Sequence, residues 1–277
     1  MIIKILGSGQ DAGIPQIGCD CDVCSRARKD KRHRRFGPSI ALFDKKEGFC
    51  YLIDASPDFK YQLDMVKEEL DKIKRKGRIP VSGILLTHAH LGHCSGLWYL
   101  GKEASDEKNI SVFCSPKMGE LLRTNYPFNL LIQRKNIIIK EIRADEEFEL
   151  EGFRFVPILV PHRSEAADTL AYIIKSKKRT IYIPDVDHWT ARIIEEIKAA
   201  DIAIIDGTFY SKNEISRYDD VPHPPITETI ELFEECDTQI YFTHINHTNP
   251  INRRGREREN IQKQGFKIAY DGLTIDI

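Results

Sequence analysis

Short apolar runs alternate along the chain with polar or charged segments. The runs at 1–6, 39–43 and 49–53 are each bounded by turn-forming or charged residues. Such runs predict buried strands. The segment 60–76, which follows, is instead charged and amphipathic and predicts a helix. Strand and helix signals that alternate in this way predict an α/β fold.

Four apolar runs end in residues that can bind a metal ion. They lead into His88, His162, Asp185 and His244. Loops at the strand ends of stacked sheets gather at one rim, where binding and catalytic residues are commonly found. Imidazole and carboxylate groups are ligands of zinc and similar ions. The pattern therefore predicts that residues far apart in the chain converge on one metal centre.

The densest signal is the stretch 87–93, THAHLGH, which follows the apolar run 81–86. Three imidazoles lie within six residues here, between a predicted strand and a predicted helix. His88 and His90 can point the same way from an extended loop, and His93 can point back from the first helical turn. A polar turn that happens to contain histidines is the alternative. We favour a metal site, because spaced histidine clusters are a strong metal signal.

Three of the seven cysteines are clustered at Cys19, Cys21 and Cys24. Three thiols this close can hold a tetrahedral zinc ion if a fourth ligand comes from elsewhere, and His33 is the nearby candidate. An odd number of cysteines fits a structural zinc in a reducing compartment better than a disulfide framework. The remaining four are expected to be buried small hydrophobic side chains: Cys50, Cys94, Cys114 and Cys236.

The composition limits the classes of function. The 277 residues suit one large domain or two fused halves, and a hydrophobic content of 41% supports a sizeable core. A formal net charge of -1 provides no overall field for nucleic acid or an acidic membrane. The apolar runs are far shorter than a bilayer-spanning helix, and the N-terminal run reads as a strand rather than a signal peptide. We therefore expect a cytoplasmic protein without a membrane partner, and we rank nucleic acid low.

Two further segments have competing interpretations. The basic run 26–35 could guide a phosphate or carboxylate substrate, but we favour a solvated helix face, because Asp30 interrupts the run and the whole chain is nearly neutral. The loop 7–13 is rich in glycine. It could cradle a phosphate, but we favour a plain turn because its spacing fits no nucleotide-binding fingerprint.

The stretch 87–93 also resembles a known motif. It is similar to the His-x-His-x-Asp-His motif of the metallo-β-lactamase superfamily, with Gly92 where the aspartate is expected. Within that superfamily the chain resembles the subgroup of pyrroloquinoline-quinone biosynthesis protein B and the carbon–phosphorus lyase phosphodiesterase. The resemblance runs from 7–9 to 248–250. It implies a single metallo-β-lactamase-like domain over residues 1–277, folded as a four-layer αββα sandwich with two mixed sheets face to face.

The resemblance also implies which residues hold the metal ions. The first active-site ion would be bound by His88, His90 and His162. The second would be bound by His93 and His244. Asp185 would be the carboxylate that bridges the two ions and takes part in catalysis. His247 would complete the zinc site of the three clustered cysteines.

Other polar residues are expected to support this centre. Asp54 ends a predicted strand and could accept the free ring N–H of a ligating histidine, as an aspartate does in the superfamily. His223 lies between two prolines, and we favour a general acid over a loop histidine bonded to backbone; the phosphodiesterase relatives carry a histidine in a comparable place. Asp187 and His188 are expected at the surface or behind a ligand, and Asp206 either supports the site or forms a turn.

These features predict a metal-dependent hydrolase that attacks a phosphodiester or related ester of a small-molecule substrate with a metal-activated water. One or two divalent ions (zinc, manganese or iron) would serve the active site, beside one structural zinc. Because Gly92 removes a carboxylate ligand, we expect the second active-site ion to be weakly held. Two alternatives stay open, namely a quinone-cofactor biosynthesis protein with an oxidative or accessory role, and a metal-stabilised binding protein without turnover. A homodimer is a working assumption only.

Overall fold

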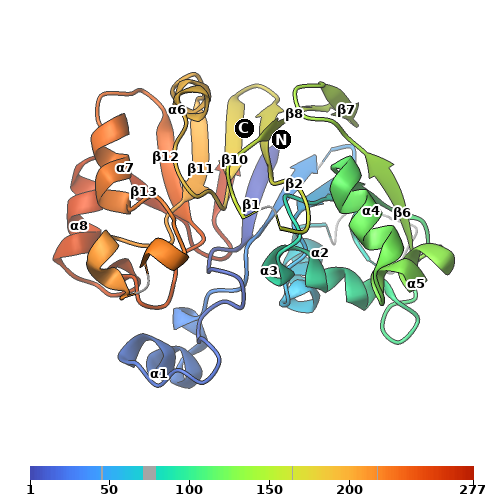
Figure 1. The fold of residues 1–277 in the computed structure, drawn as a ribbon, viewed down its shortest axis with the longest axis horizontal. Coiled ribbons are helices and arrows are strands. Elements are labelled where there is room, and N and C mark those ends of the chain that lie inside the picture. The colour runs from blue at the N-terminus through green and yellow to red at the C-terminus, as the bar shows by residue number, and fades with distance from the viewer. Residues whose placement is uncertain (45, 71–78, 164, 217) are drawn as a thin grey trace.

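The computed structural model of the chain describes residues 1–44, 46–70, 79–163, 165–216 and 218–277. Within this part of the chain, two seven-stranded sheets form the centre of the molecule and helices cover their outer faces (Figure 1). This arrangement is the expected four-layer αββα sandwich. Its two halves follow each other in the sequence, except that the last strand returns to the first sheet.

The first sheet combines antiparallel and parallel pairings. In spatial order its strands are β14 (Thr274–Asp276), β1 (Ile2–Gly7), β2 (Ser39–Asp44), β3 (Phe49–Ile53), β4 (Gly83–Leu85), β5 (Ile110–Cys114) and β6 (Ile137–Glu141). The pairings from β14 to β3 are antiparallel, and those from β3 to β6 are parallel.

The second sheet repeats this pattern. In spatial order its strands are β7 (Phe148–Leu150), β8 (Phe153–Leu159), β9 (Leu170–Lys175), β10 (Arg179–Ile183), β11 (Ile202–Asp206), β12 (Gln239–Thr243) and β13 (Lys267–Ile268). The pairings from β7 to β10 are antiparallel, and those from β10 to β13 are parallel. Because parallel neighbours end at the same edge, each sheet delivers several strand-end loops to one rim.

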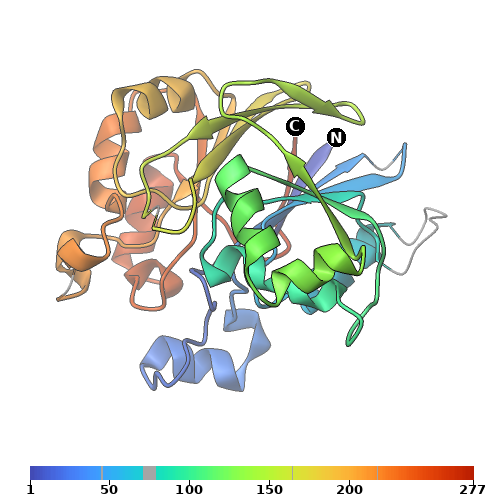
Figure 2. The same cartoon turned by 45° about the vertical axis from the view of Figure 1, so that its right-hand side comes forward.

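Helices close both outer faces. The first sheet is covered by α2 (Phe59–Leu70), α4 (Pro116–Thr124) and α5 (Phe128–Gln133), and the second by α6 (Ala191–Lys198), α7 (Ile226–Phe233) and α8 (Arg256–Lys263). A single turn, α3 (Leu91–Cys94), follows β4 and continues into the 3-10 helix η2 (Ser95–Leu100). The remaining helix, α1 (Asp22–Lys29), lies below the two sheets in both views (Figures 1 and 2).

Alternating side chains bury both faces of each sheet. In β2, Ile40 and Leu42 enter the core between the sheets, whereas Ala41 and Phe43 face the helices of the first layer. A strand that is buried on both sides reads as a continuous apolar run. This explains why the strands were recognisable by their apolar runs rather than by alternation of apolar and polar residues.

Two predicted elements differ in extent from those observed. The helix expected at 60–76 is α2, Phe59–Leu70, and the expected residues 71–76 lie outside the described part of the chain. Of the apolar run 81–86, only Gly83–Leu85 forms a strand. Across the described residues, no helix combines the length and the apolar character that crossing a bilayer requires.

Two buried tyrosines on paired strands provide a matched test of the central core. The Tyr172 hydroxyl donates a hydrogen bond of 2.6 Å to the Leu86 carbonyl, just before the histidine stretch. The Tyr182 hydroxyl, equally buried, has no hydrogen-bond partner among the described residues. We expect Tyr172→Phe to lower the free energy of unfolding by about 1–3 kcal/mol, because a carbonyl loses its donor. Tyr182→Phe should be neutral or stabilising. Denaturant unfolding compares the two, and equal losses would contradict the assignment.

Candidate active site

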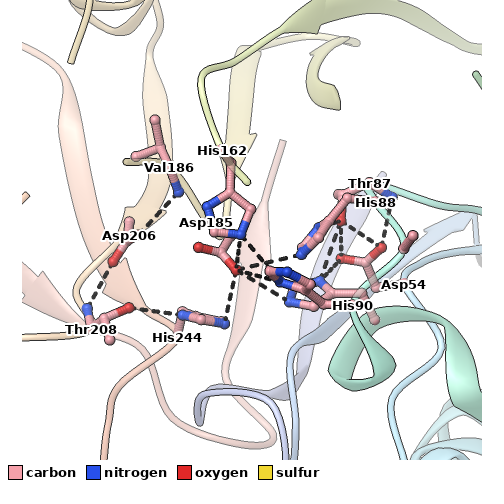
Figure 3. A network of polar contacts seen from close by, with 12 residues as sticks. Asp54, Thr87, His88, His90, His162, Asp185, Val186, Asp206, Thr208 and His244 are labelled. Atoms are coloured by element: carbon pink, nitrogen blue, oxygen red, sulfur yellow. Dashed lines mark hydrogen bonds and ion pairs between the residues drawn. The ribbon is translucent and has the colours of Figure 1, made fainter. Parts of the chain in front are cut away.

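The histidine stretch lies at the centre of a cluster that both sheets build. His88 and His90 lie on the loop between β4 and α3, His162 follows β8, and Asp185 follows β10. Their side chains point toward one another (Figure 3). The His162 Nε2 atom is 3.1 Å from Asp185 Oδ2 and 3.2 Å from His90 Nδ1. One ligand atom from each of these four residues lies within 4.8 Å of the others, so they can share one ion.

Asp185 lies among five imidazoles. Its Oδ2 atom is between 3.1 and 4.0 Å from a ring nitrogen of each of His88, His90, His93, His162 and His244. His93 comes from α3, and His244 comes from the loop after β12. The residues expected as ligands of two ions therefore surround a single carboxylate.

Several polar atoms in this cluster are buried without a hydrogen bond. Within the described residues, they include the Nε2 atoms of His88, His93 and His244 and the Oδ1 atom of Asp185. Each unpaired buried polar atom costs about 1–3 kcal/mol, so a group of them around one point is unfavourable unless a ligand satisfies it. Divalent cations would do so, because imidazole and carboxylate are their ligands. The residues present therefore fit a metal centre.

Asp54 and Thr87 fix two of the imidazoles. The His93 Nδ1 atom is 2.7 Å from Asp54 Oδ2, and the Thr87 amide donates a 2.8 Å hydrogen bond to Asp54 Oδ1. The Thr87 hydroxyl is 2.9 Å from His88 Nδ1. Since the Nδ1 atoms are held in this way, the Nε2 atoms of both rings remain for an ion. Asp54 thus lies behind a candidate ligand, as expected.

Two further imidazoles are held by side chains of the second sheet. The His162 Nδ1 atom is 2.9 Å from Asp187 Oδ1, and the His244 Nδ1 atom is 2.8 Å from Thr208 Oγ1. Asp187 and His188 are both expected at the surface or behind a ligand. Asp187 lies behind the candidate ligand His162, and His188 is exposed. Thr208 had no role assigned from the sequence.

His223 is joined to the cluster through Asp206. The His223 Nδ1 atom is 2.7 Å from Asp206 Oδ2 and 3.4 Å from Asp185 Oδ1. Burial lowers the pKa of His223, but the Asp206 and Asp185 carboxylates outweigh it and raise that pKa to about 9. The Asp206 carboxylate also accepts hydrogen bonds from the Val186 and Thr208 amides. Asp206 therefore both supports the site and orders the turn that follows β11.

Burial determines the direction of the pKa shift for three of the six candidate ligands. It lowers the pKa of His88, His90 and His244, which favours the neutral imidazole that binds metal ions. Burial also lowers the pKa of His93, but the Asp54 carboxylate outweighs it and raises that pKa. For Asp185, burial raises the pKa, and the surrounding histidines, led by His244 and His223, bring it well below the usual range.

A cavity of about 570 Å³ opens onto the cluster. His90, His162, Asp185 and His223 line it from the metal side. Its remaining wall includes Arg163 and a set of apolar residues: Pro57, Leu91, Trp98 and Val221. Beside the candidate ligands, the cavity therefore offers the Arg163 guanidinium and an apolar surface.

The cysteine cluster forms a separate candidate site. Ligand atoms of Cys19, Cys21, Cys24 and His247 all lie within 4.8 Å of one another. The structure thus brings His247 to the thiols, whereas His33 lies near Asp30 on the surface. Burial raises the pKa of Cys21, but hydrogen bonds from the Cys24 amide and from the neighbouring side chains, His247 first, lower it to about 6, which favours a thiolate.

The structure also shows where the four scattered cysteines and the basic run 26–35 lie. Cys50, Cys94 and Cys114 are buried as expected, but Cys236 is only partly buried, because it lies in the turn after α7. Most cations of the run 26–35 are exposed, in keeping with a solvated surface. A second cavity of about 1070 Å³ is lined by five cations of the run and by three arginines near α8: Arg26, Lys31, Arg32, Arg34, Arg35, Arg253, Arg254 and Arg258.

The fold and the histidine–aspartate cluster define a metallo-β-lactamase-type protein. The family model described as the β-lactamase superfamily domain matches residues 50–245, and the chain belongs to this family.

Relatives within the family extend over the whole chain. Coenzyme PQQ synthesis protein B of Azotobacter vinelandii is 26% identical over 308 aligned residues, covering 100% of both sequences. The Zn²⁺-bound crystal structure of PqqB from Methylobacterium extorquens is similar with a TM-score of 0.86, at 26% identity and 100% coverage of both chains. A diphosphatase from the PhnP family is similar with a TM-score of 0.74, at 25% identity, covering 99% of this chain and 96% of that one.

Asp11 was missed from the sequence. A ligand atom of Asp11 lies within 4.8 Å of those of His93 and His244. Asp11 belongs to the glycine-rich loop 7–13, for which the sequence alone favours a plain turn. The signal that could have pointed to Asp11 is Gly92. A histidine motif that lacks its usual aspartate can accommodate a carboxylate from another segment of the chain.

The cysteine site gives a test that does not depend on activity. We expect His247→Ala to lose about one zinc ion per purified chain and to lower Tm, because zinc bound only by the folded chain contributes to folding. His33→Ala is the matched control and should retain its zinc. Elemental analysis and thermal unfolding measure both effects. Zinc content that stays unchanged in His247→Ala would remove His247 from the site.

Proposed function

We propose that the chain is a metal-dependent hydrolase that acts on a phosphodiester or a related ester. The observation that carries this proposal is the group of buried histidine and aspartate atoms without a hydrogen-bond partner among the described residues. This group lies beside an open cavity, which Asp185, His90 and His162 line. Divalent cations bound there would polarise the substrate and lower the pKa of a water molecule toward neutrality. Hydrolysis with such metal centres is general in this superfamily.

Two groups of histidines would bind the two cations. His88, His90 and His162 would hold one cation, and His93 and His244 would hold another. Asp185 would contact both, because its carboxylate lies between the two groups of rings. The side chains that contact the Nδ1 atoms, namely Asp54, Thr87, Asp187 and Thr208, keep the ligand atoms in place. The site is therefore ordered before substrate binds.

His223 is suited to protonate the leaving group. Its Nδ1 atom is held by Asp206, which leaves Nε2 as the ring nitrogen for the cavity that His223 lines. The two carboxylates beside it favour the protonated ring, as a general acid requires. The Tyr218 hydroxyl donates a hydrogen bond to the His223 carbonyl and further restricts the loop.

The cavity wall supports an anionic substrate with an apolar portion. Arg163 supplies a positive charge in the cavity wall, and guanidinium groups bind phosphate oxygens well. Trp98 is 49% exposed and Leu91 is 65% exposed, although both are large hydrophobic residues. Exposed apolar residues beside a polar centre are typical of a ligand-binding wall. The similarity to a PhnP-family diphosphatase agrees with phosphate chemistry.

A second candidate is a step in quinone-cofactor biosynthesis. The match to coenzyme PQQ synthesis protein B over the whole chain favours it. A histidine–carboxylate site with open positions can also hold iron, which would suit oxidative chemistry. Aerobic turnover by the iron-loaded protein, in the absence of any esterase activity, would favour this candidate over hydrolysis.

Hydrolysis of bis-p-nitrophenyl phosphate by the manganese- or zinc-loaded protein tests the main proposal. We expect activity in the wild type and its loss in His90→Ala, since that variant removes a ligand atom without emptying the core. His188→Ala, an exposed histidine close in sequence to Asp185, is the control and should keep full activity. Absence of hydrolysis in a fully loaded wild type, across several esters, would contradict the proposal.

The role of His223 predicts a dependence on the leaving group. His223→Gln should lower kcat by about 10²–10⁴ for an alkyl ester, because an alkoxide needs a proton to depart. The loss should be much smaller for a p-nitrophenyl ester, whose leaving group is stable as an anion. Steady-state kinetics on the two esters measure the difference. Equal losses on both would show that His223 only positions its neighbours.

A further inference from the structure

Gly92 lies against Asp11. A Cβ atom at position 92 would be 2.3 Å from Asp11 Oδ1 and 2.5 Å from Asp11 Cα. Contacts this short do not occur, so any side chain at position 92 would displace Asp11. The absence of a side chain at residue 92 is thus what allows the Asp11 carboxylate to occupy this place.

The Asp11 carboxylate lies near two candidate ligands whose other carboxylate, Asp185, is shared with the first group of histidines. One Asp11 oxygen lies within 4.8 Å of a ring nitrogen of His93 and of His244. The Nε2 atoms of both histidines are buried and, among the described residues, have no hydrogen-bond partner. Among the described residues, the Asp11 side chain forms no hydrogen bond or ion pair. It also lines the cavity at the candidate active site.

The backbone holds Asp11 in place. The flanking Gln10 amide donates to the Ile245 carbonyl, and the Ile245 amide donates to the Ser8 carbonyl, at 3.2 and 2.9 Å. These bonds fasten the loop after β1 to the residue next to His244. Asp11 itself has a φ of 35°, a left-handed conformation that aspartate adopts more readily than most residues.

We propose that Asp11 is the carboxylate ligand of the second active-site cation, together with His93, His244 and Asp185. The carboxylate that the motif lacks at position 92 is then supplied from the first loop of the chain. The second ion has four protein groups instead of three, and two of these are anionic. The proposal rests on the metal centre of the proposed function, and it replaces the expectation of a weakly held second ion.

Metal titration tests this proposal without reference to turnover. Protein with its cysteine zinc in place is stripped at the active site and titrated with Mn²⁺ or Zn²⁺, and bound metal is measured by elemental analysis. We expect Asp11→Asn to weaken the second active-site ion by more than about tenfold, since even the loss of an outer-shell partner typically costs that much. The first ion should bind as in the wild type.

Two controls separate metal ligation from a change in folding. Asn keeps the size of Asp and tolerates positive φ. Asp145→Asn makes the same change at another aspartate of positive φ, which is ion-paired with Arg192 and belongs to none of the candidate metal clusters, and should leave both ions in place. Gly92→Ala alters no ligand atom but pushes against Asp11, so it should weaken the same ion. Gly255→Ala, whose added Cβ would meet only Glu257 Oε2, at 3.5 Å, should not.

The outcomes distinguish this proposal from the proposed function. A second ion that binds Asp11→Asn as tightly as the wild type overturns the role of Asp11, even if hydrolysis is observed. A wild type that never binds a second active-site ion overturns it as well. Selective loss of the second ion in Asp11→Asn supports it, even if no ester is hydrolysed and the proposed function fails.

Discussion

The site depends on one constraint, the convergence of five imidazoles on the Asp185 carboxylate. Burying imidazoles whose Nε2 atoms have no hydrogen bond opposes folding. In four of the five rings, the chain compensates by fixing the Nδ1 atom. Asp54, Thr87, Asp187 and Thr208 each occupy an Nδ1 atom. These partners hold the free nitrogens near one point. The geometry of the centre is therefore set by groups that need not touch the ion at all.

The repeated sheet pattern explains how such distant residues meet. In each half, three antiparallel pairings are followed by three parallel ones. The loop after β4 carries the histidine stretch, and the loops after β10 and β12 carry Asp185 and His244. When the two sheets pack through their shared apolar core, these loops come together at one rim. The core that joins the sheets therefore also positions the ligands.

The main cluster could be predicted from the sequence because its residues directly follow apolar runs. His88, His162, Asp185 and His244 all obey that rule, and the resemblance divided them between two ions. Residues outside the rule were harder to place. Asp11 lies in a glycine-rich turn, and its relation to Gly92 exists only in three dimensions. At the cysteines, the residues alone left His33 as the nearby candidate and only the resemblance pointed to His247, which the structure brings to the thiols.

The two candidate metal sites share the same two segments of chain. The loop after β1 carries Asp11 and continues to the clustered cysteines, while the loop after β12 carries His244 and then His247. Two backbone hydrogen bonds already join these segments, from the Ile245 amide to the Ser8 carbonyl and from the Gln10 amide to the Ile245 carbonyl. An ion at either site would cross-link them again and reduce the entropy cost of ordering them for the other. A zinc at the cysteines, which do not line the cavity, would in this way help to hold Asp11 and His244 where the active site needs them.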